Sequence, residues 1–475
     1  MWYDWVYYYL TQINVGILIF IGIPFGLQLI YMLLFWLPKK TFKKTDKINR
    51  IAVVIPAHNE EDVIYDTVKD VIDNQKYPRE MFDIYVIADN CNDKTEELAK
   101  KAGATVFVHT DPDPKHHMVG YALDYGFKEL LKIDSAKGAP GELVLKPWKR
   151  VKKGRKAESI TVNKYYDFII RLDADNHINP EFFSLMNDAY NSGVKIARPY
   201  ESAINMTQSA YTKACGLYYI FDSRGGSRVR ERIHVDAHVN GPGSLIEMDI
   251  IRRIGGYDTV TMCEDTEFNF KRMFEKIKPH FVEDAVVYED LPSTLKDTLA
   301  RNKRLGAGNT RMLIRYTPKL FFYTFKNCNL SFLENFLTYI FIHICPILCI
   351  WLPGYYIYAY IYHIMGFMGP ADLGGYEMVA GMFYVNNPGD WIWTYSWVIV
   401  FCIGVLFAFC GILQGVLMVV FDYKKMGAKR RRDLISGILL FPFFSIIYVI
   451  TITIGVLSKP KWTKVRRNPV KKEAD

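Results

Sequence analysis

The chain lacks the cysteine spacing that a zinc site requires. It contains only eight cysteines among 475 residues, and no two of them form a pair typical of metal ligands. Those toward the C-terminal end lie in apolar runs, where a thiol packs as a small hydrophobic group. Those in the more polar middle of the chain, Cys91, Cys215 and Cys263, are expected to stay reduced. Cysteine therefore provides no candidate metal site.

Charged residues are absent from a long run near the start of the chain. Residues 14–37 contain none, and at ~1.5 Å per residue they reach across a ~30 Å hydrocarbon core. The run is too long for a signal-peptide core, and it lacks both a basic segment before it and a small-residue cleavage pattern. The lysines that follow from Lys39 to Lys44 place that end in the cytosol. Residues 1–44 are therefore predicted to form an aromatic interfacial segment and a transmembrane helix.

Charge is also scarce in three C-terminal apolar runs. Two spans are predicted at 336–368, with a break at Pro353 and Gly354, and at 391–421. The third run, 434–457, has basic residues on both sides, so one crossing would export a basic cluster. Pro442 favours a re-entrant or broken hairpin there. The scarcity of ionisable residues in these spans argues against a transporter.

Acidic residues are slightly fewer than basic ones, which gives a formal charge of +9. The excess lies mostly next to the apolar runs, so it indicates anionic lipid headgroups as partners and no nucleic acid. Half of the residues are hydrophobic and 23% are charged. This mixture predicts a soluble domain joined to a multi-pass membrane region. The expected divisions are a soluble domain at 45–317, interfacial helices at 318–335, membrane helices at 336–458 and a basic cytosolic tail at 459–475.

The soluble region alternates short β-branched runs with helical patterns. Strands are expected at 51–55, 84–88, 105–108 and 168–172, which predicts a mostly parallel, Rossmann-like sheet with helices on both faces. Ligands of such sheets bind at the carboxyl ends of the strands, where Asp89, Asp173 and Asp175 follow. Residues 133–164 are rich in Gly, Pro, Lys and Arg, and they are predicted to form a basic surface insertion, most of it solvated loop.

Two aspartates, separated by one residue, follow directly after the buried run 168–172. Asp173 and Asp175 would repel each other unless a positive charge lies between them. A divalent Mg²⁺ or Mn²⁺ shared with a diphosphate explains the pair, since such ions combine carboxylate and phosphate ligands. A solvated acidic turn is the alternative.

Three later clusters also carry candidate chemistry. A turn with Gly241 and Gly243 would let the backbone approach a ligand closely. Glu264 and Asp265 precede a helical pattern, where a plain N-terminal cap is the alternative to a catalytic role. Arg301 and Arg304 lie three apart on one helical face, which suits either a diphosphate or a solvated surface.

The order of these features resembles a membrane-integrated family 2 glycosyltransferase with a GT-A fold, like cellulose and hyaluronan synthases. Residues 54–61 resemble the loop after the first strand, with His58 where the family usually has Tyr. Asp89 matches the aspartate that holds uracil, and Asp173–Asp175 match the metal-binding Asp-x-Asp. Glu264–Asp265 match the Thr-Glu-Asp motif, with Cys263 in place of threonine. The resemblance implies nucleotide-sugar contacts from these positions: Pro56, Ala57, His58, Glu60, Asp89, Asp173, Arg301 and Arg304.

The chain departs from the family on the acceptor side. The segment from Arg301 to Leu305 occupies the place of Gln-x-x-Arg-Trp, with Arg301 for Gln and Leu305 for Trp. The tryptophan resembles a platform for the acceptor sugar, so its absence bears on chain elongation. Val119 also stands where the family often has a phosphate-contacting lysine. Gly241, Gly243 and Leu305 are the residues expected to lie in the acceptor region.

The resemblance implies an inverting hexosyltransferase with its α/β GT-A domain in the cytosol beneath an α-helical membrane region, at the plasma membrane. Asp265 would be the catalytic base, aided by Glu264, and Mg²⁺ or Mn²⁺ the cofactor held by Asp173 and Asp175. The leading hypothesis is transfer from a UDP-sugar to a growing polysaccharide, with accessory export subunits or further copies of the chain as candidate partners. A lipid-linked acceptor is the alternative. A silent scaffold is disfavoured because all three aspartates are present.

Overall fold

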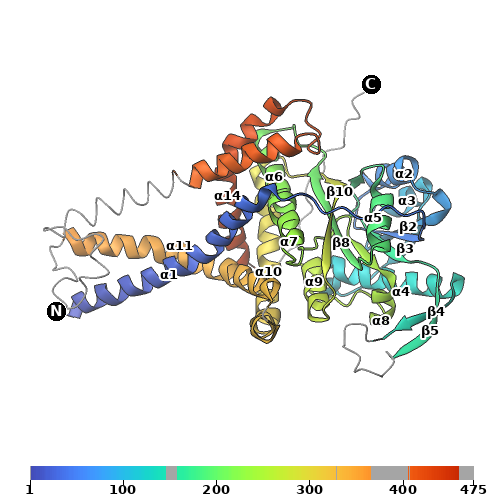
Figure 1. The fold of residues 1–475 in the computed structure, drawn as a ribbon, viewed down its shortest axis with the longest axis horizontal. Helices are drawn as coiled ribbons and strands as arrows, with labels where there is room; N and C mark the ends of the chain where they lie inside the picture. Colours follow the sequence, from blue (N-terminus) through green and yellow to red (C-terminus); the bar gives the residue numbers. More distant parts are fainter. Residues whose placement is uncertain (1, 146–157, 328, 365–404, 406, 459–475) are drawn as a thin grey trace.

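The computed structural model describes all residues except 1, 146–157, 328, 365–404, 406 and 459–475 (Figure 1). Its centre is an eight-stranded mixed sheet. In spatial order the strands are β3 (Thr105–His109), β2 (Phe82–Asp89), β1 (Ile51–Ala57), β6 (Phe168–Arg171), β9 (Leu245–Glu247), β8 (Ile196–Ala203), β10 (Pro279–Glu289) and β7 (His177–Ile178). All pairings are parallel except those of β9 with β6 and β8, and of β7 with β10. The predicted α/β sheet is confirmed, as expected for a GT-A domain.

Side chains of β1 alternate between two cores, as the twofold period of a strand requires. Ile51, Val53 and Ile55 point into one core, and Ala52 and Val54 into the other. The first core is closed by α2 (Ile64–Asn74), α3 (Thr95–Ala102) and α5 (Phe182–Asn191). The second is closed by α4 (Val119–Lys137), α8 (Met248–Ile254) and α9 (Glu264–Phe274). Because both faces are covered, most residues of β1 and β2 are apolar and buried.

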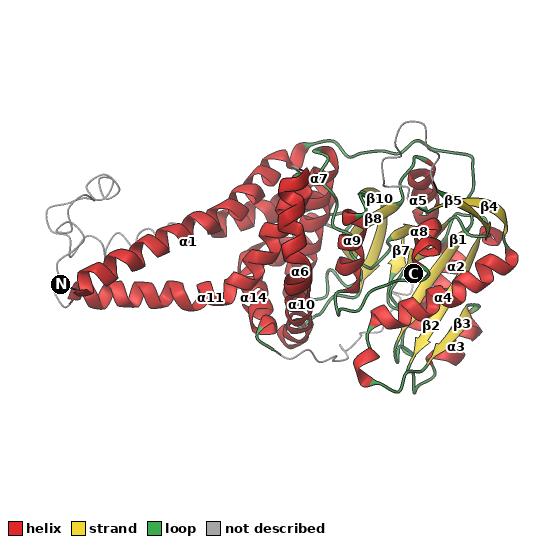
Figure 2. Ribbon diagram, turned by 90° about the horizontal axis from the view of Figure 1, so that it is seen from below, coloured by secondary structure: helices red, strands yellow, loops and turns green. Residues whose placement is uncertain are grey.

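The remaining helices lie beyond the β8–β10 end of the sheet. Figure 2 shows α6, α10 and α14 between the sheet and the two long helices α1 and α11. Their bounds are α1 (Trp2–Leu33), α6 (Ala210–Ile220), α7 (Val229–Arg232), α10 (Leu295–Asn327), α11 (Leu330–Ile364) and α14 (Ile435–Val456). A π-helical segment, Phe221–Arg228, joins α6 to α7. Short 3₁₀ turns occur at Leu34–Trp36, Arg79–Met81, Pro114–His116 and Arg431–Leu434.

The predicted break at Pro442 is wrong. Residues 435–456 form the single helix α14, with Pro442 inside it. Proline removes one helical hydrogen bond but can be accommodated where a neighbouring helix packs against it. A Cβ on Gly411 would lie 2.9 Å from Pro442, so the neighbouring segment makes room for the ring. Gly437 allows a still closer approach to Lys213 of α6, where a Cβ would lie 2.4 Å from the lysine Cβ.

Two other expected divisions differ from the structure. Helix α11 continues through Pro353 and Gly354 without the predicted break. The expected interfacial unit 318–335 is not separate, since α10 runs on to Asn327 with Pro318 inside and α11 begins at Leu330. Pro318, Pro353 and Gly354 are exposed, and a Cβ on Gly354 would meet no atom of the described residues within 4 Å, so contacts with neighbouring helices do not explain the continuity at these positions. The expected spans and loops within 365–404, and the tail 459–475, lie outside the described residues.

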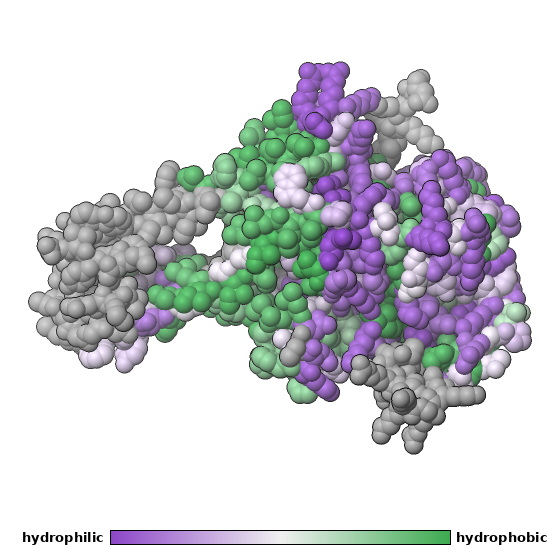
Figure 3. All heavy atoms as spheres, in the orientation of Figure 1, coloured by the Kyte–Doolittle hydropathy of each residue, from purple (hydrophilic) through white to green (hydrophobic). Residues whose placement is uncertain are grey.

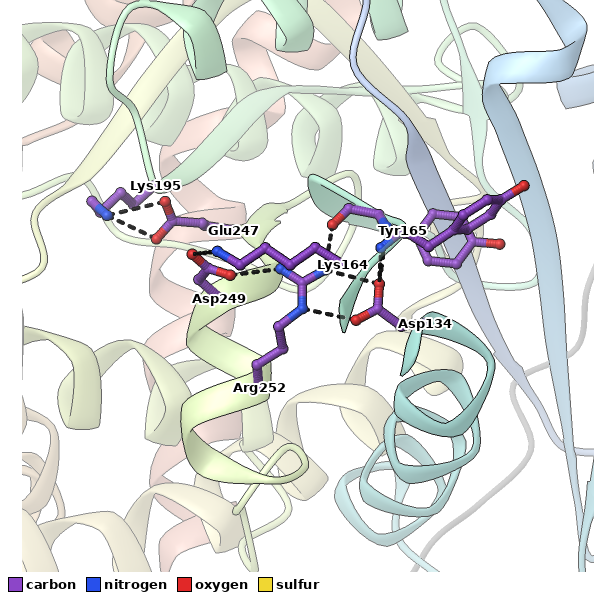
Figure 4. A network of polar contacts seen from close by, with 8 residues as sticks. Asp134, Lys164, Tyr165, Lys195, Glu247, Asp249 and Arg252 are labelled. Carbon is purple, nitrogen blue, oxygen red and sulfur yellow. Dashed lines mark hydrogen bonds and ion pairs between the residues drawn. The ribbon is translucent and has the colours of Figure 1, made fainter. Parts of the chain in front are cut away.

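The predicted solvated insertion 133–164 contains ordered structure. Helix α4 extends to Lys137, and β4 (Ala139–Val144) pairs antiparallel with β5 (Ser159–Lys164). Figure 4 shows how polar contacts anchor this hairpin to α8. Lys164 binds Asp249 at 2.7 Å, and Arg252 bridges Asp249 and Asp134 at 2.6 and 2.8 Å. The hairpin is therefore fixed where it leaves the domain.

One helix in the described part of the chain is long and apolar enough to cross a membrane. It spans Arg431–Val456, and 39% of its apolar window is buried inside the protein. Figure 3 shows apolar surface gathered over the helices and hydrophilic surface over the sheet-bearing part. Membrane association is thus only weakly indicated by this helix, and the number of crossings stays a prediction.

Candidate active site

The carboxyl ends of three parallel strands meet at one edge of the sheet. Ala57 at the end of β1 lies opposite Ala88 of β2, and Val54 lies opposite Arg171 of β6. This register brings residues 56–58, Asp89 and the Asp173–Asp175 turn to a common edge, as the strand pattern predicted. The polar site is therefore assembled by apolar strands buried on both faces.

The Asp89 carboxylate is held in place by its neighbours. Asp89 is buried, and its Oδ1 accepts hydrogen bonds from the Asn90 amide at 2.8 Å and contacts His109 Nδ1 at 2.7 Å. The Asp89 carbonyl oxygen lies 2.6 Å from His58 Nδ1. Nearby, the Glu60 backbone N–H donates to Thr95 Oγ1 at 2.8 Å. His109, which the sequence analysis missed, is the last residue of a strand that ends at this edge.

The Asp173–Asp175 turn is fixed by hydrogen bonds to its backbone. The Asp173 N–H donates to Asn176 Oδ1 at 2.8 Å, and the Asn176 N–H donates to the Asp173 carbonyl at 3.1 Å. Thr67 Oγ1 donates to the Ala174 carbonyl at 2.7 Å. Asp175 is buried, whereas the Asp173 side chain is 38% exposed. The turn therefore presents one accessible and one buried carboxylate.

These two carboxylates fit a divalent cation only in part. Within the described residues, no group of three or more His, Cys, Asp or Glu side chains is arranged to hold a metal ion. Magnesium and manganese are commonly bound by one or two carboxylates plus phosphate and water. The donor set of Asp173 and Asp175 therefore suits an ion that arrives with, or is completed by, a diphosphate.

Glu264 and Asp265 open helix α9 beside this turn, although their partners differ. Glu264 Oε1 accepts a hydrogen bond from Arg171 Nη2 at 2.7 Å. Burial raises the pKa of Glu264, while Arg171 acts in the opposite direction and Asp265 raises it further. Asp265 Oδ2 accepts from the Gly241 N–H at 3.2 Å, and its Oδ1 accepts from the Thr266 N–H at 2.7 Å. Glu264 is thus the ion-paired carboxylate and Asp265 the one held by backbone amides.

The glycine turn is required for two reasons. Gly243 has a φ of +66°, in the left-handed region that other residues rarely adopt. A Cβ on Gly241 would lie 2.7 to 2.8 Å from the guanidinium of Arg171. The backbone makes the expected close approach at Gly241, but it approaches the side chain of Arg171 and not a ligand.

Arg301 and Arg304 lie one turn apart on α10 and have different surroundings. Burial lowers the pKa of Arg304, as does Arg301, whereas Glu264 and Asp173 act to raise it. Arg304 therefore lies in the field of the acidic groups at the sheet edge. Arg301 lies 3.6 Å from Glu289 and 5.2 Å from the ring centroid of Tyr219.

Leu305 and Arg301 line a small cavity of about 30 Å³ between α6, α10 and α14. Its other lining residues are Cys215, Tyr218, Tyr219, Pro292, Thr298, Asn302, Phe444 and Tyr448. Most of these are aromatic or apolar. The position expected to carry an acceptor platform thus faces the helix that is apolar enough to span a membrane.

A further acidic residue, Glu289, belongs to the same edge and was not predicted from the sequence. It is the last residue of β10, which is parallel to β8. Burial raises the pKa of Glu289 to about 8, Arg301 opposes this, and Glu201, Asp175 and Asp173 add to it. Glu289 could have been recognised from the sequence because, like Asp89, it is a carboxylate at the end of a buried strand.

Because folding raises the pKa of Glu289, protonation of this carboxyl makes a pH-dependent contribution to the free energy of unfolding, and this contribution can be measured. The folded state favours the protonated carboxyl, so this contribution is complete below about pH 4.5 and is lost as the pH rises through about 8. We expect the melting temperature of the metal-free protein to fall, relative to Glu289→Gln, over that interval. Thermal unfolding of both proteins across the pH range measures this, and a constant difference between them would contradict it.

Behind the edge lies a buried ionic network around the π-helical segment. Arg198 pairs with Asp222 at 2.6 Å and Glu201 at 3.2 Å, and Glu201 accepts from the Asn240 amide at 2.8 Å. Arg230 pairs with Glu334 of α11 at 2.5 Å. These contacts connect the glycine turn to the long helices.

Family models and a curated relative match the chain. The model "Glycosyl transferase family group 2" matches residues 168–456, and "Glycosyl transferase family 2" matches residues 52–130. The "Probable glycosyltransferase YdaM" of Bacillus subtilis is 25% identical over 307 residues, which are 62% of this chain and 63% of the relative. The alignment thus spans less than two thirds of that relative's length.

Solved structures show a more distant likeness. The mannosyltransferase PcManGT from Pyrobaculum calidifontis, in complex with GDP-Man and Mn²⁺, has a TM-score of 0.49 at 11% identity, covering 92% of this chain and 98% of that one. Glucosyl-3-phosphoglycerate synthase from Mycobacterium tuberculosis has a TM-score of 0.34 at 16% identity, covering 59% and 86%. The assignment rests on the family models, the larger of which covers more than half of the sequence. The chain belongs to glycosyltransferase family 2.

Proposed function

We propose that the protein is a membrane-bound inverting glycosyltransferase that moves a sugar from a UDP-sugar to a growing polysaccharide. The observation that carries the proposal is the convergence of Asp89, the Asp173–Asp175 turn, Asp265 and Arg304 on one sheet edge. Asp89 would bind the base of the nucleotide, and the residues at the end of β1 would line its path.

Asp265 is the proposed general base. Its Oδ2 and Oδ1 are oriented by the N–H groups of Gly241 and Thr266. The carboxylate takes the proton of an acceptor hydroxyl as the oxygen attacks the anomeric carbon. The bond from that carbon to the phosphate oxygen breaks, its electron pair leaves with the nucleoside diphosphate, and the configuration inverts. General base catalysis typically contributes about 10²–10⁴-fold.

The leaving diphosphate needs positive charge. Arg304 lies in the field of Asp173 and Glu264, so its guanidinium is a candidate for that charge. A Mg²⁺ or Mn²⁺ ion held by Asp173 and Asp175 would stabilise negative charge on the phosphate oxygens when bound. Arg301 is paired with Glu289, so we assign it a weaker part in donor binding than Arg304.

The exposed apolar surface of α14 supports an acceptor that binds at the lipid bilayer. Leu439 and Phe443 of α14 are 58% and 61% exposed, and more apolar residues are exposed along the same helix. We propose that α14 and α1 anchor a cytosolic catalytic domain to the plasma membrane in a multi-pass arrangement. Export of the product, with or without accessory subunits, is part of this proposal.

A lipid-linked acceptor is the second candidate. The observation in its favour is that Leu305, which replaces the tryptophan that resembles an acceptor platform, lies beside the aromatic residues of α6 and α14. The cavity of about 30 Å³ itself has room only for about one water molecule, so the acceptor would bind outside it. In this case each turnover adds one sugar to an amphipathic acceptor and does not extend a chain.

The size of the product distinguishes the two acceptors. Purified full-length protein in lipid vesicles is incubated with Mn²⁺ or Mg²⁺ and each of a panel of radiolabelled UDP-sugars. We expect one of them to give a polymer that sediments as high-mass carbohydrate. A labelled species that extracts into organic solvent and carries one sugar would support the second candidate. No transfer from any nucleoside-diphosphate sugar would contradict both.

A further inference from the structure

Arg171 is a buried charged residue at the carboxyl end of a central, otherwise apolar strand. Its neighbours in β6 are Phe168, Ile169 and Ile170, and Arg171 is only 3% exposed. Strand β6 lies between β1 and β9 in the sheet. A buried cation is costly unless it is paired, so its retention at this position requires an explanation.

One nitrogen of Arg171 contacts acids from two separate motifs. Nη2 lies 2.7 Å from Glu264 Oε1 and 3.5 Å from Asp173 Oδ1. The Nε and Nη1 atoms are buried and have no hydrogen-bond partner in the described part of the chain. The usual strong pairing of arginine is bidentate, with two parallel bonds to one carboxylate. Arg171 instead bridges the Asp-x-Asp turn and the start of α9 through a single atom.

The glycine turn is the third segment attached to Arg171. Its backbone packs against the guanidinium at Gly241, where a Cβ would approach to 2.7 Å. The backbone N–H of Arg171 donates to the Ser244 carbonyl at 3.0 Å, and this hydrogen bond fixes the other end of the turn. The Gly241 N–H in turn donates to Asp265 Oδ2. A shift of the guanidinium would therefore move both Glu264 and the amide that orients Asp265.

We infer that Arg171 is a positioning residue for sugar transfer, which holds the Asp173 turn, the Gly241 turn and the Glu264–Asp265 pair in one arrangement. The inference rests on the proposed function. Arg171 acts through these groups and needs no contact with the substrate. Its charge balances the acids at the floor of the site, and its planar group supports the backbone of the Gly241 turn.

Arg252 provides a matched control in the same domain. Its side chain is 5% exposed, and it bridges Asp134 and Asp249 (Figure 4). Neither partner belongs to the candidate site. Replacing either arginine with methionine leaves a buried acid without its cation, Glu264 in one case and Asp134 in the other, whereas Asp249 keeps its contact with Lys164. Both variants should therefore lose stability for the same reason. Only Arg171→Met should disturb the chemistry.

The experiment compares four full-length proteins in lipid vesicles: wild type, Arg171→Met, Arg171→Lys and Arg252→Met. Steady-state transfer gives kcat and KM for the UDP-sugar, titration calorimetry gives UDP affinity with Mn²⁺, and thermal unfolding identifies a temperature at which all are folded. We expect Arg171→Met to lower kcat by about 10²-fold, because small misplacement of catalytic groups has effects of this size. Its KM and UDP affinity should stay within about threefold of the wild type. Arg171→Lys should recover part of kcat, since it keeps the charge but loses the planar fork.

A second variant tests the same inference without removing the charge. Gly241→Ala would displace the guanidinium, and it should lower kcat while UDP binding is retained. The inference is overturned if folded Arg171→Met keeps a kcat within about threefold of the wild type, or if Arg252→Met loses kcat to the same extent. A wild type that transfers no sugar would overturn the proposed function and this inference together. An active wild type with an unaffected Arg171→Met would overturn the inference alone.

Discussion

Replacing Asp265 with asparagine is expected to lower kcat for sugar transfer by about 10²–10⁴-fold. Asparagine keeps the shape of the side chain, but its single oxygen can accept from only one of the two N–H groups of Gly241 and Thr266, and it cannot accept the proton of the acceptor hydroxyl. The nucleotide would be bound elsewhere on the edge, so UDP affinity should change by less than about threefold. Single-turnover transfer and titration calorimetry with UDP measure the two effects separately.

Asp258→Asn is a suitable control for this substitution. Asp258 precedes α9 by a few residues, its side chain is 58% exposed, and its φ of 50° is well tolerated by asparagine. We expect wild-type turnover from it. If Asp265→Asn retained wild-type turnover, the assignment of the base would be wrong, and a loss of UDP binding instead of turnover would move Asp265 to the donor side.

Removal of either carboxylate of the Asp173–Asp175 turn is expected to have the second large effect on sugar transfer. Asp175→Asn is expected to lower kcat by about 10²–10³-fold, the usual consequence of losing one charge-stabilising contact. The Mn²⁺ concentration for half-maximal activity should rise by more than about tenfold, because two carboxylates become one. Chelation should abolish transfer by the wild type, and added Mn²⁺ or Mg²⁺ should restore it.

The control for the metal prediction is Asp284→Asn on β10. Asp284 forms an exposed ion pair with Lys39 at 2.7 Å, and such pairs contribute little to stability. Its metal dependence should equal that of the wild type. Full activity of the wild type in a chelator, or an unchanged Mn²⁺ requirement in Asp175→Asn, would show that the turn does not hold a catalytic metal.

The sheet edge could be predicted because its strands are short apolar runs that end on polar residues. Asp89 and Asp173 follow such runs directly, and parallel pairing alone brings the strand ends together. Glu289 also ends a strand, yet its partner Arg301 lies on α10 and only the fold brings them near. Strand endings thus predicted which carboxylates meet at the sheet edge, but not the ion pair that Glu289 forms with a distant helix.

Arg171 could not be found from sequence for a related reason. It sits inside an apolar run, and its partner Glu264 is 93 positions away along the chain. Nothing local marks it as more than a tolerated charge. The glycines at 241 and 243 were recognised as a close approach, but the sequence did not indicate that one of them approaches this arginine.

The helical region was the least predictable part of the fold. Pro442 and the Pro353–Gly354 pair predicted breaks, yet α14 and α11 continue through them. The effect of a proline depends on whether a neighbouring segment fits its ring, as Gly411 does for Pro442, and that fit is a tertiary property. The fit at Pro442 therefore could not be predicted from the local sequence, and the exposed Pro353–Gly354 pair has no comparable neighbour among the described residues.

The central claim is that Asp89, Asp173, Asp175 and Arg304 form one site for a nucleoside-diphosphate sugar and its metal. A structure of the full-length protein with UDP and Mn²⁺, with manganese located by anomalous scattering, tests it most directly. The account predicts manganese between the Asp173–Asp175 turn and the diphosphate, uracil at Asp89 and Arg304 beside the phosphates. Manganese or UDP bound away from this sheet edge would contradict it.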